Sequence, residues 1–589
     1  MSEDKGEKLP ELARRKGFFW QSFELYGGVG GFLDYGPLGS LLKRKIEEKW
    51  LDSFVLKQGI MLVETPIVSP SKVFEASGHL EHFSDPIIDC KKCGRKWRAD
   101  HILEEQAGIS GEGMSLDALA EAIKKNNIKC PECGGELGQP SNFNELFKTS
   151  IGPYSENVGY CRPETAQGIF TNFKRLSEAA RGKLPFGVAQ IGRCLRNEIA
   201  PRQGPIRLRE LTIMEIEMFF DPEDEGCNEF DQVAKETIRI LPQKLISEGE
   251  KEPMEIPILE AVEDHYIKYA WNGYFMALAK KYISGLGIPE AGQLFLEKGE
   301  HERAHYSAQT FDQLVELSRW GWVEVSGHSC RSEYDLKRHA AFSKADLSIF
   351  KPYQLSRSEK VLRIRPEKSA IHEDFGESER LVSQLINESN PEELNGIIER
   401  GGVATLSRGA TSFKITGRHV RFSQEEVEEK GHRVIPYVVE PSFGVDRILY
   451  ATCEYAMTER EGRTIMRFPL DVVPIQLAVF PLVAKDRLPE KAKILGSLLR
   501  GEGFTVEYDE AGSIGRRYAR ADESGIPIGV TVDYQTLEED TVTLRSRDTW
   551  DQVRREIEGL PELLRQYFMK KIMFEDMGTM VRRSGSEQR

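Results

Sequence analysis

The segment that most constrains the fold lies at residues 186–220, FGVAQIGRCLRNEIAPRQGPIRLRELTIMEIEMFF. Apolar residues alternate at period two at both of its ends, which is typical of strands, and the polar stretch between them predicts a long antiparallel hairpin. On its second strand Glu215 and Glu217 lie two residues apart, so they share one face. The connecting loop carries four arginines, Arg196, Arg202, Arg207 and Arg209.

This hairpin has a functional and a structural interpretation. A guanidinium group can bind two phosphate oxygens at once, and a carboxylate can bind an ammonium group. The segment therefore predicts a site for a nucleotide and an amine together. The alternative is a surface hairpin with ordinary ion pairs, which contribute only about 0–1 kcal/mol each when they are exposed. The hairpin alone leaves both interpretations open, and the rest of the chain decides between them.

Length and composition limit the class of protein. A chain of 589 residues exceeds one core and suggests roughly four domains, and 40% hydrophobic with 30% charged residues is typical of a soluble globular protein. No run of eighteen apolar residues occurs, and MSEDKGEKLPELARRKG lacks a secretory signal, so we expect a cytosolic protein. The net charge of −14 argues against a general nucleic-acid coat protein, but it is compatible with local positive clefts.

Four of the nine cysteines form two CxxC pairs, in DCKKCGRKWRADH and KCPECGGEL. In a cytosolic protein this pattern favours tetrahedral zinc over disulfides, and four thiolates leave no open coordination position. A redox role is the weaker alternative, because neither pair lies at the strand-to-helix junction that a thioredoxin-like site needs. We therefore predict a structural zinc ion held by Cys90, Cys93, Cys130 and Cys133.

The N-terminal third supplies further elements. The glycines at 27–31 lack the Gly-Lys-Ser/Thr of a phosphate loop and predict a turn, followed by an amphipathic helix over 38–56. The next strand is broken by Pro66 and Pro70, which places it at a sheet edge where another chain can pair with it. In YCRPETAQGIF a helix is expected over 165–176, and helix capping would explain the acidic residue of this motif but not its arginine.

The middle of the chain is expected to alternate between insertions and core. The patterns DQVAKETIRILPQKL and DHYIKYAWNGYFMALAKKYI predict a helical insertion, followed by the strand QLFLEK and a helix after His305. Glu324 alternates with Val323 and Val325 on a strand. A carboxylate in that position is ordinarily solvated, but next to a phosphate site it would be a magnesium ligand.

The last third closes the core and adds a domain. RVIPYVVEPSFGVDRILYATCEYA predicts a strand and then a helix from about Val445, with Arg447 in its first turn. Arginine there is unfavourable for the helix dipole, so we expect another anion as its partner. From Pro469 the order β-α-β-α-β-β-α predicts a separate α/β domain. Its expected basic face comprises Arg516, Arg517, Arg520, Arg545 and Arg547.

Several motifs stand in a characteristic order: RRKGFFWQSFELYGG, YCRPETAQGIF, LRNEIAPRQGPIRLRELTIMEIE, EPSFGVDR and GSIGRRYARADESGIP. On these motifs nearly the whole chain resembles the archaeal and eukaryotic glycyl-tRNA synthetases, a family of class II aminoacyl-tRNA synthetases. Within that family, residues 59–68 correspond to class motif 1, residues 196–198 with the following loop to motif 2, and residues 444–447 to motif 3. Asp446 stands where many relatives carry a second glycine, although other class II enzymes use a Gly-x-Asp-Arg form.

The resemblance implies an α+β fold. Its catalytic domain is a six- or seven-stranded antiparallel sheet flanked by helices rather than a Rossmann fold, and the chain forms a homodimer through motif 1. The resemblance also implies that the C-terminal domain binds the anticodon. The expected domains are a catalytic core at 1–85, 141–222, 288–349 and 431–468, a zinc-binding insertion at 86–140, a helical insertion at 223–287, an insertion at 350–430, the anticodon-binding domain at 469–575 and a disordered tail at 576–589.

The reaction implied by the resemblance joins glycine to ATP as glycyl-adenylate and then transfers glycine to the 3′ end of tRNA(Gly). The first step is attack of an ionised carboxylate on the α-phosphorus, so no general base is required and positioning with charge stabilisation suffices. We expect acceptor-end contacts from the zinc module and the insertions, and anticodon contacts from the C-terminal domain. The implied cofactors are Mg²⁺ and the structural zinc.

The resemblance also implies residue roles. Arg196 contacts the α-phosphate, Glu198 the adenine amino group, Arg207 the outer phosphates and Arg447 the γ-phosphate. Magnesium is expected on Glu324, with Glu440 as the second candidate. The whole ATP set is Arg196, Asn197, Glu198, Ile206, Arg207, Leu208, Arg209, Glu210, Leu211, Glu324, Val325, Gly444 and Arg447. The glycine set is Arg162, Glu164, Leu211, Thr212, Glu215, Arg331, Glu440, Ser442 and Gly444.

Glycine selection must be steric, because a missing methylene is worth only about 1–3 kcal/mol of binding. By the resemblance, Glu164, Glu215 and Ser442 hold the ammonium group and leave no room for a methyl group on the α-carbon. Two rival functions remain. A catalytically silent paralogue, such as an accessory subunit of a nucleic-acid polymerase, would be expected to lose the motif arginines. A synthetase for threonine, proline or histidine would lack the loops RPETAQG and EPSFG.

Overall fold

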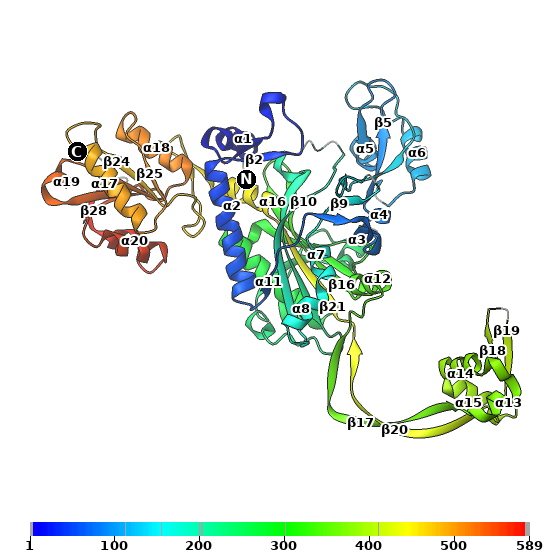
Figure 1. The fold of residues 1–589 in the computed structure, drawn as a ribbon. Helices are drawn as coiled ribbons and strands as arrows, with labels where there is room; N and C mark the ends of the chain where they lie inside the picture. The colour runs from blue at the N-terminus through cyan, green and yellow to red at the C-terminus, as the bar shows by residue number, and fades with distance from the viewer. Residues whose placement is uncertain are drawn as a thin grey trace. The chain divides into compact units, whose positions relative to one another are not determined.

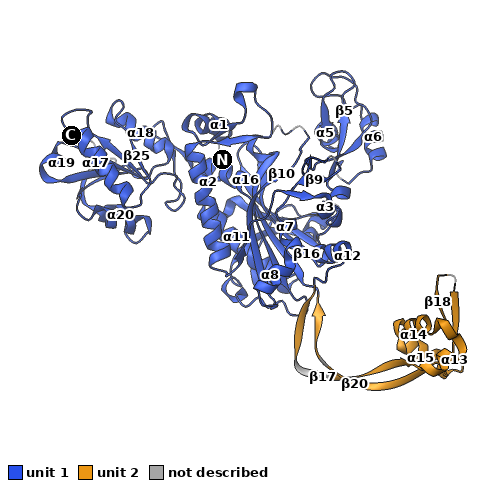
Figure 2. Cartoon of the chain, viewed as in Figure 1, with its two compact units in different colours: residues 1–347, 435–589 blue, residues 348–434 orange. Residues whose placement is uncertain are grey.

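The computed structural model describes residues 4–111, 113–154, 156–199, 201, 204–300, 302–409 and 411–582. Arg202 of the predicted arginine loop lies outside these ranges. The chain divides into unit 1, residues 1–347 and 435–589, and unit 2, residues 348–434 (Figure 2). Within the described ranges, no helix has the length and apolar character needed to cross a membrane.

The predicted hairpin is confirmed. Strands β10 (Phe186–Leu195) and β11 (Glu210–Phe220) pair antiparallel over their whole length. They belong to a nine-stranded sheet in which only the pairs β12·β14 and β10·β3 are parallel. Its order is β13 (Met254–Pro257), β12 (Thr237–Leu241), β14 (Gln293–Glu297), β15 (Gln309–Leu317), β16 (Gly321–Ser332), β21 (Tyr437–Gly444), β11, β10 and β3 (Met61–Leu62).

The sheet corrects two predictions. Residues 223–287 are not a purely helical insertion, because TIRIL forms β12 with Ile238 and Ile240 buried, and so the sheet exceeds the predicted six or seven strands. The segment directly after His305 is not a helix but leads into β15, in which Phe311, Val315 and Leu317 are buried. The predicted edge position is confirmed, because β3 ends the sheet, but the expected single strand is divided: residues 68–70 form an edge strand of a separate sheet.

Helices cover both faces of this sheet (Figure 1). On one face, α2 (Pro37–Trp50) continues as a π-helix (Leu51–Leu56), as the pattern over 38–56 predicts, and α11 (Ala270–Gly285) lies beside it. Here Trp50, Phe54 and Tyr282 pack around Phe443 of β21. On the other face, α7 (Ala166–Thr171) and α8 (Phe173–Ala179) place Phe170 and Phe173 against Phe219. This second face, which also carries Glu215, is the one that holds the site.

Short sheets and helices surround the large sheet. Two sheets are β1 (Phe19–Gln21) with β2 (Leu33–Tyr35), and β4 (Val68–Pro70) with β9 (Val158–Cys161) and β8 (Lys148–Ser150). The CxxC segment contains β5 (Ser84–Asp89), β6 (Lys96–Arg98), β7 (Ser141–Asn144), α5 (Ala99–Ala107) and α6 (Leu116–Lys125). Other helices of unit 1 are α1 (Asp4–Lys16), α3 (Ser71–Ala76), α10 (Ile258–Glu263), α12 (Tyr334–Ser343) and α16 (Val445–Ala456).

The C-terminal α/β region forms a six-stranded sheet in the order β25-β24-β26-β27-β28-β29. Its last strand begins at Thr579 and pairs with β28, so the tail expected from residue 576 is wrong as far as residue 582. Its strands are β24 (Leu477–Pro481), β25 (Val506–Tyr508), β26 (Ile528–Val532), β27 (Thr541–Ser546), β28 (Gln552–Glu556) and β29 (Thr579–Arg582), and its helices are α17 (Leu488–Gly501), α18 (Ile514–Ser524), α19 (Tyr534–Glu539) and α20 (Leu560–Phe568).

The predicted basic face of this region is largely wrong. Arg517, Arg545 and Arg547 are buried, with 2%, 5% and 2% of their surface exposed. Arg545 donates two hydrogen bonds to the buried Asp522 at 2.9 and 3.0 Å. These arginines are internal polar groups of the domain, because each guanidinium finds its acceptors inside the fold.

Unit 2 covers residues 348–434, where the sequence analysis expects an insertion at 350–430. A long antiparallel ribbon of β17 (Ile349–Pro366) and β20 (Val420–Val434) carries a small domain with its own core, which includes Ile371 and Ile386. The domain consists of α13 (Lys368–Phe375), α14 (Glu379–Glu388), α15 (Pro391–Glu399), β18 (Ala404–Arg408) and β19 (Thr411–Ile415).

Candidate active site

A cavity of about 540 Å³ is lined by residues of β11, β16 and β21 and by the loops before α7 and β15. The hairpin, the RPETAQG motif and the EPSFG motif all reach it, so it unites segments far apart in the sequence. The predicted site residues that line it are Glu164, Arg196, Glu198, Ile206, Arg207, Leu208, Leu211, Glu215, Glu324, Val325, Glu440, Ser442, Gly444 and Arg447.

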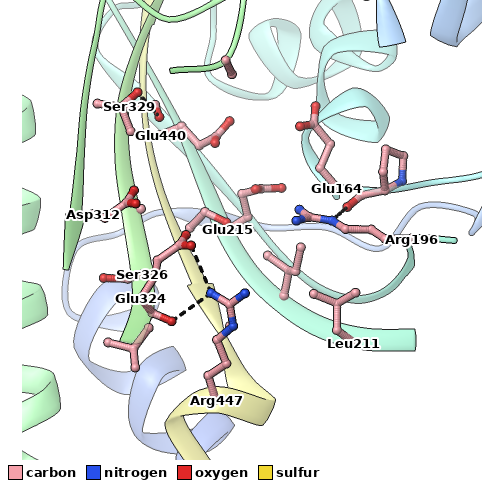
Figure 3. A pocket seen from close by; sticks show the side chains of 18 of the residues that line it. Glu164, Arg196, Leu211, Glu215, Asp312, Glu324, Ser326, Ser329, Glu440 and Arg447 are labelled. Carbon is pink, nitrogen blue, oxygen red and sulfur yellow. Dashed lines mark hydrogen bonds and ion pairs between the residues drawn. The ribbon is translucent and has the colours of Figure 1, made fainter. Parts of the chain in front are cut away.

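One end of the cavity is acidic. Glu164 precedes α7, Glu215 lies on β11, and Glu440 lies on the neighbouring strand β21 (Figure 3). The three residues are 7%, 2% and 5% exposed. Glu215 stands opposite Ser442 in the strand register, and its carboxylate accepts a 2.9 Å hydrogen bond from the backbone N–H of Thr165. Three carboxyl groups therefore face one small volume.

A fully buried arginine stands behind these carboxylates. Arg331 on β16 binds Glu164 at 3.1 Å, binds Asp335 at 2.8 Å and also pairs with Glu440. Its guanidinium lies 3.6 Å from the centroid of the Tyr306 ring. Arg331 does not itself line the cavity. It therefore acts as the internal counterion of the acidic end.

The pKa values at this end follow from burial and from Arg331. Burial alone would raise the pKa of Glu164, but Arg331 and His79 outweigh it and hold that pKa well below its ordinary value. Burial and the charge of Glu164 raise the pKa of Glu215, and burial raises that of Glu440 well above the ordinary value despite Arg331. Since one guanidinium faces several carboxyl groups, the cavity favours a cation such as an ammonium group.

The other end of the cavity is rich in arginine. Arg447, in the first turn of α16, donates a 3.0 Å hydrogen bond to the carboxylate of Glu324 (Figure 3). Arg207 pairs with Glu198. The partner expected for Arg447 is thus Glu324 itself: burial would raise the pKa of this carboxyl, yet Arg447 lowers it to about 2. These are bidentate cations of the kind that bind phosphate.

Arg196 lies between the two ends. Its Nε donates a 3.1 Å hydrogen bond to the carbonyl of Pro163, and its guanidinium lies 5.9 Å from the centroid of the Phe83 ring. The hydrogen bond joins the hairpin loop to the RPETAQG segment. Arg196 is therefore placed beside Glu164, next to the boundary between the acidic and basic ends (Figure 3).

Sequence reasoning missed several residues of the site. Asp312 on β15 lines the cavity beside Glu324, and burial with the charge of Glu324 raises its pKa to about 7. Its carboxylate lies 3.0 Å from Lys298. The sequence analysis expected a helix after His305 and therefore did not place Asp312 on a strand. The cavity is also lined by His79, His82, His305 and Tyr306.

Besides Arg331, five predicted site residues do not line the cavity. Arg162 donates hydrogen bonds to the carbonyls of Arg193 and Thr65, at 2.9 Å each, and so braces the backbone. Thr212 points to Lys43, and Glu210 pairs with Arg193. Arg209 binds the carbonyls of Gly30 and Glu198, and Asn197 donates its N–H to the carbonyl of Glu145.

The four predicted zinc ligands converge. The sulfur atoms of Cys90, Cys93, Cys130 and Cys133 all lie within 4.8 Å of one another. Tetrahedral zinc with Zn–S bonds of about 2.3 Å requires sulfur–sulfur distances of roughly 3.8 Å. The pairs Cys93–Cys130 and Cys90–Cys133 lie at 3.8 and 3.5 Å, so the donor set fits zinc.

A smaller chamber of about 290 Å³ adjoins the arginine end. Asp85, Glu145 and Glu198 face Arg98 and Arg207 there. Glu145 is 6% exposed, and its carboxyl group shares a side-chain hydrogen bond with Asp85. Burial and the charges of Glu198 and Asp85 raise the pKa of Glu145 to about 8. Glu145 is therefore mostly a neutral acid at pH 7.

An antiparallel sheet that presents arginines from a hairpin and from the first turn of α16, beside an acidic amine site, has the features that the resemblance implies. Fold and site together define a class II aminoacyl-tRNA synthetase. The comparisons agree, because residues 476–567 match the family described as "Anticodon binding domain".

The relatives identify the family. Glycine–tRNA ligase from Aeropyrum pernix is 48% identical over 99% of this chain and 100% of its own, and that from Methanocaldococcus jannaschii is 43% identical over 96% and 99%. The chain belongs to the glycine–tRNA ligase family, which confirms the resemblance. A solved prolyl-tRNA synthetase from Cryptosporidium parvum matches 95% of this chain and 78% of its own at 10% identity and a TM-score of 0.49, too weak to bear on the assignment.

We expect Glu145→Gln to stabilise the fold at pH 8 and to leave its stability nearly unchanged at pH 5. The carboxyl has a pKa of about 8 in the fold against an ordinary 4.5. The stability contributed by its protonated form is complete below pH 4.5 and is lost as pH rises to 8, by about 1.4 kcal/mol for each unit of pKa difference. Urea unfolding at both pH values measures it. Glu104→Gln, on an exposed side chain, is the control, and equal stabilisation at both pH values contradicts the interpretation.

Proposed function

We propose that this chain activates glycine with ATP and transfers it to the 3′ end of tRNA(Gly). The observation that carries the proposal is the single cavity with carboxylates at one end and arginines at the other. Such a cavity accepts an amino acid by its ammonium group and ATP by its phosphates. Membership of the glycine–tRNA ligase family supports glycine as the amino acid.

Glycine lies with its ammonium group among Glu164, Glu215 and Ser442. Its carboxylate then points toward Arg196, next to the place where the α-phosphate of ATP binds. The carboxylate is already ionised at neutral pH and attacks the α-phosphorus directly, and pyrophosphate leaves. The enzyme holds the two reactants in line and neutralises charge, so the reaction needs no side chain as a base.

Binding of ATP exchanges the ion pairs of the arginine end. Arg207 leaves Glu198 to bind the outer phosphates, and the released Glu198 accepts a hydrogen bond from the adenine amino group. Arg447 likewise leaves Glu324 for the γ-phosphate. Because phosphate offers bidentate, charge-assisted hydrogen bonds, each arginine gains a partner at least as strong as the carboxylate that it gives up.

Glu324 together with Asp312 would hold magnesium. Both side chains line the arginine end, and carboxylate oxygens are the ligands that Mg²⁺ takes from proteins. Glu440, the second candidate, pairs with Arg331 at the acidic end, which favours a role in ammonium binding. When bound, the ion would neutralise charge on the phosphates.

Glycine is selected by exclusion of a side chain. Glu164 and Glu215 are fixed by Arg331 and by Thr165, so they act as rigid walls as well as charges. A methyl group on the α-carbon would displace one of them. A pocket that merely lacked contacts for the methyl group would discriminate by only about 1–3 kcal/mol.

The remaining partners follow from the same assignment. The C-terminal domain binds the anticodon, as its match to the anticodon-binding family supports, and the zinc module and the insertions contact the acceptor end. Two chains form a homodimer through the edge strand β3 and the motif 1 segment around it. The enzyme works in the cytoplasm, where its tRNA and ATP are found.

Glycine-dependent exchange of labelled pyrophosphate into ATP, measured without tRNA, tests the proposal. We expect exchange with glycine and none with alanine, serine, threonine or proline, because only glycine fits between the carboxylates. Exchange with another amino acid contradicts the pocket assignment. Absence of exchange from folded, zinc-loaded protein contradicts activation altogether and favours a catalytically silent binding protein.

We expect Glu215→Ala to raise the Michaelis constant for glycine roughly tenfold to a hundredfold and to leave that for ATP nearly unchanged. A hydrogen bond to a charged group is worth about 1.5–3 kcal/mol, and Glu215 supplies one only to the ammonium end. Pyrophosphate exchange at varied glycine and varied ATP gives both constants. Glu178→Ala, on an exposed side chain of α8, is the control. Equal increases in both constants contradict the assignment.

We expect about one zinc ion for each chain and its loss in Cys130→Ser, because a tetrahedral thiolate site binds poorly with one ligand removed. The variant should also be cleaved faster by protease within residues 86–140, whose small core includes Cys90 and Cys130. Elemental analysis and limited proteolysis measure the two effects. Cys161→Ser, outside the cluster, is the control. Full zinc content in Cys130→Ser contradicts the site.

A further inference from the structure

A buried ion pair lies at the edge of the cavity, where Asp446 is one of the lining residues and Lys43 is not. Lys43 of α2 and Asp446, the residue before Arg447, are 9% and 4% exposed, and Lys43 Nζ lies 3.2 Å from Asp446 Oδ1. A buried charge is costly unless it is paired and hydrogen-bonded. None of the roles assigned above uses Lys43 or Asp446, so the pair needs its own explanation.

Each oxygen of the Asp446 carboxylate has a hydrogen-bond donor. Tyr35 donates its O–H to Oδ1, and the backbone N–H of Thr212 donates to Oδ2 at 2.7 Å. Lys43 Nζ also donates to Thr212 Oγ1 at 2.7 Å and lies 4.5 Å from the centroid of the Tyr35 ring. The cluster therefore joins β2, α2, β11 and α16 through one satisfied polar network.

The polar network continues the connection between β11 and α16 beyond the last paired residues of β11 and β21. The pairing of β11 with β21 reaches Ile213 opposite Gly444, and Thr212 is the next residue beyond it. The backbone N–H of Thr212 donates to the side chain of Asp446, where within a sheet it would donate to the carbonyl of a neighbouring strand. The start of β11 is thereby fixed to the first turn of α16.

The same N-terminal segment also holds the hairpin loop. The carbonyl of Gly31 accepts a 2.7 Å hydrogen bond from the N–H of Arg209, and the carbonyl of Gly30 accepts a 2.8 Å bond from its guanidinium. Arg209 in turn donates to the carbonyl of Glu198. Residues 30–43 thus contact both segments that carry the arginine end, the motif 2 hairpin and the start of α16.

We propose that Lys43 and Asp446 are positioning residues for the nucleotide. Their charge pair sets the separation between the hairpin, which carries Arg207, and the first turn of α16, which carries Arg447. Both arginines must reach one triphosphate, and a misplacement of about 1 Å can cost a reaction about a hundredfold. The inference rests on the proposed adenylate reaction and adds α2 to the parts that hold ATP. The glycine end, which Arg331 organises, lies outside this network.

The test compares Lys43→Met, Asp446→Asn and the double variant in the full chain. We expect each single variant to raise the dissociation constant of ATP, measured by calorimetry without glycine, and the Michaelis constant for ATP by about tenfold or more, because it leaves one buried charge unpaired. The Michaelis constant for glycine should change less than about twofold. The neutral double variant should recover to within about threefold of the unchanged chain, because neighbouring sites are not additive.

Lys45→Met is the matched control, since Lys45 also lies on α2 but its side chain is 40% exposed and forms a surface ion pair with Glu48. The proposal is overturned by single variants that lower the melting temperature but leave ATP affinity unchanged, by equal effects on ATP and glycine, or by effects that add up in the double variant. If a single variant does not fold, the other and the double variant decide. If the chain binds ATP but does not exchange pyrophosphate, the proposed function is refuted. The role of Lys43 and Asp446 is then decided by the dissociation constants for ATP alone.

Discussion

The site depends on one buried guanidinium. Arg331 has no exposed surface, yet it binds carboxylates from three separate segments: Glu164 before α7, Glu440 on β21 and Asp335 on α12. Without a cation at that point, the sheet would have to bury these groups against their mutual repulsion, at a cost of several kcal/mol for each unpaired charge. Arginine suits the position because its planar fork satisfies several acceptors at once and stays protonated. The acidic end of the cavity can therefore be buried only because Arg331 lies behind it.

The two ends of the cavity use ion pairs in different ways. At the acidic end the pairs are internal and permanent, because Arg331 lies behind the cavity surface and its partners fix the walls. At the arginine end the pairs Arg447–Glu324 and Arg207–Glu198 lie on the cavity surface itself, so a triphosphate can replace the carboxylates. The first arrangement gives rigidity, and the second gives exchangeable charge. A reaction that must discriminate a small amine and bind a large anion needs both.

The sequence predicted the parts of the site that local patterns encode. The hairpin, the turn into α16, the zinc ligands and the alternation at Glu324 follow from periodicity and spacing. Asp312 and Tyr306 were missed because they enter the cavity from strand pairing and loop packing that no local pattern reports. Thr212 and Arg162 were assigned to the ligand from their place in motifs, although the fold turns them to other partners. Likewise, TIRIL was predicted to be helical but forms β12, because its alternating apolar residues can be buried on one face of the sheet.

Steric selection of glycine requires that the carboxylate side chains lining the proposed pocket cannot move aside for a larger amino acid. A carboxylate on a freely rotating side chain would swing aside for a methyl group at a cost of about 1 kcal/mol or less, comparable to an off-rotamer torsion. Glu164 does not have that freedom, because it binds Arg331 and accepts a 2.9 Å hydrogen bond from Gln167, while His79 lies 3.5 Å away. To move it, a larger amino acid would have to break a buried ion pair, which costs about 3–5 kcal/mol. In the proposed glycine pocket, the network behind Glu164 therefore makes the smallest amino acid distinguishable, since it converts an absent side chain into a large energy difference.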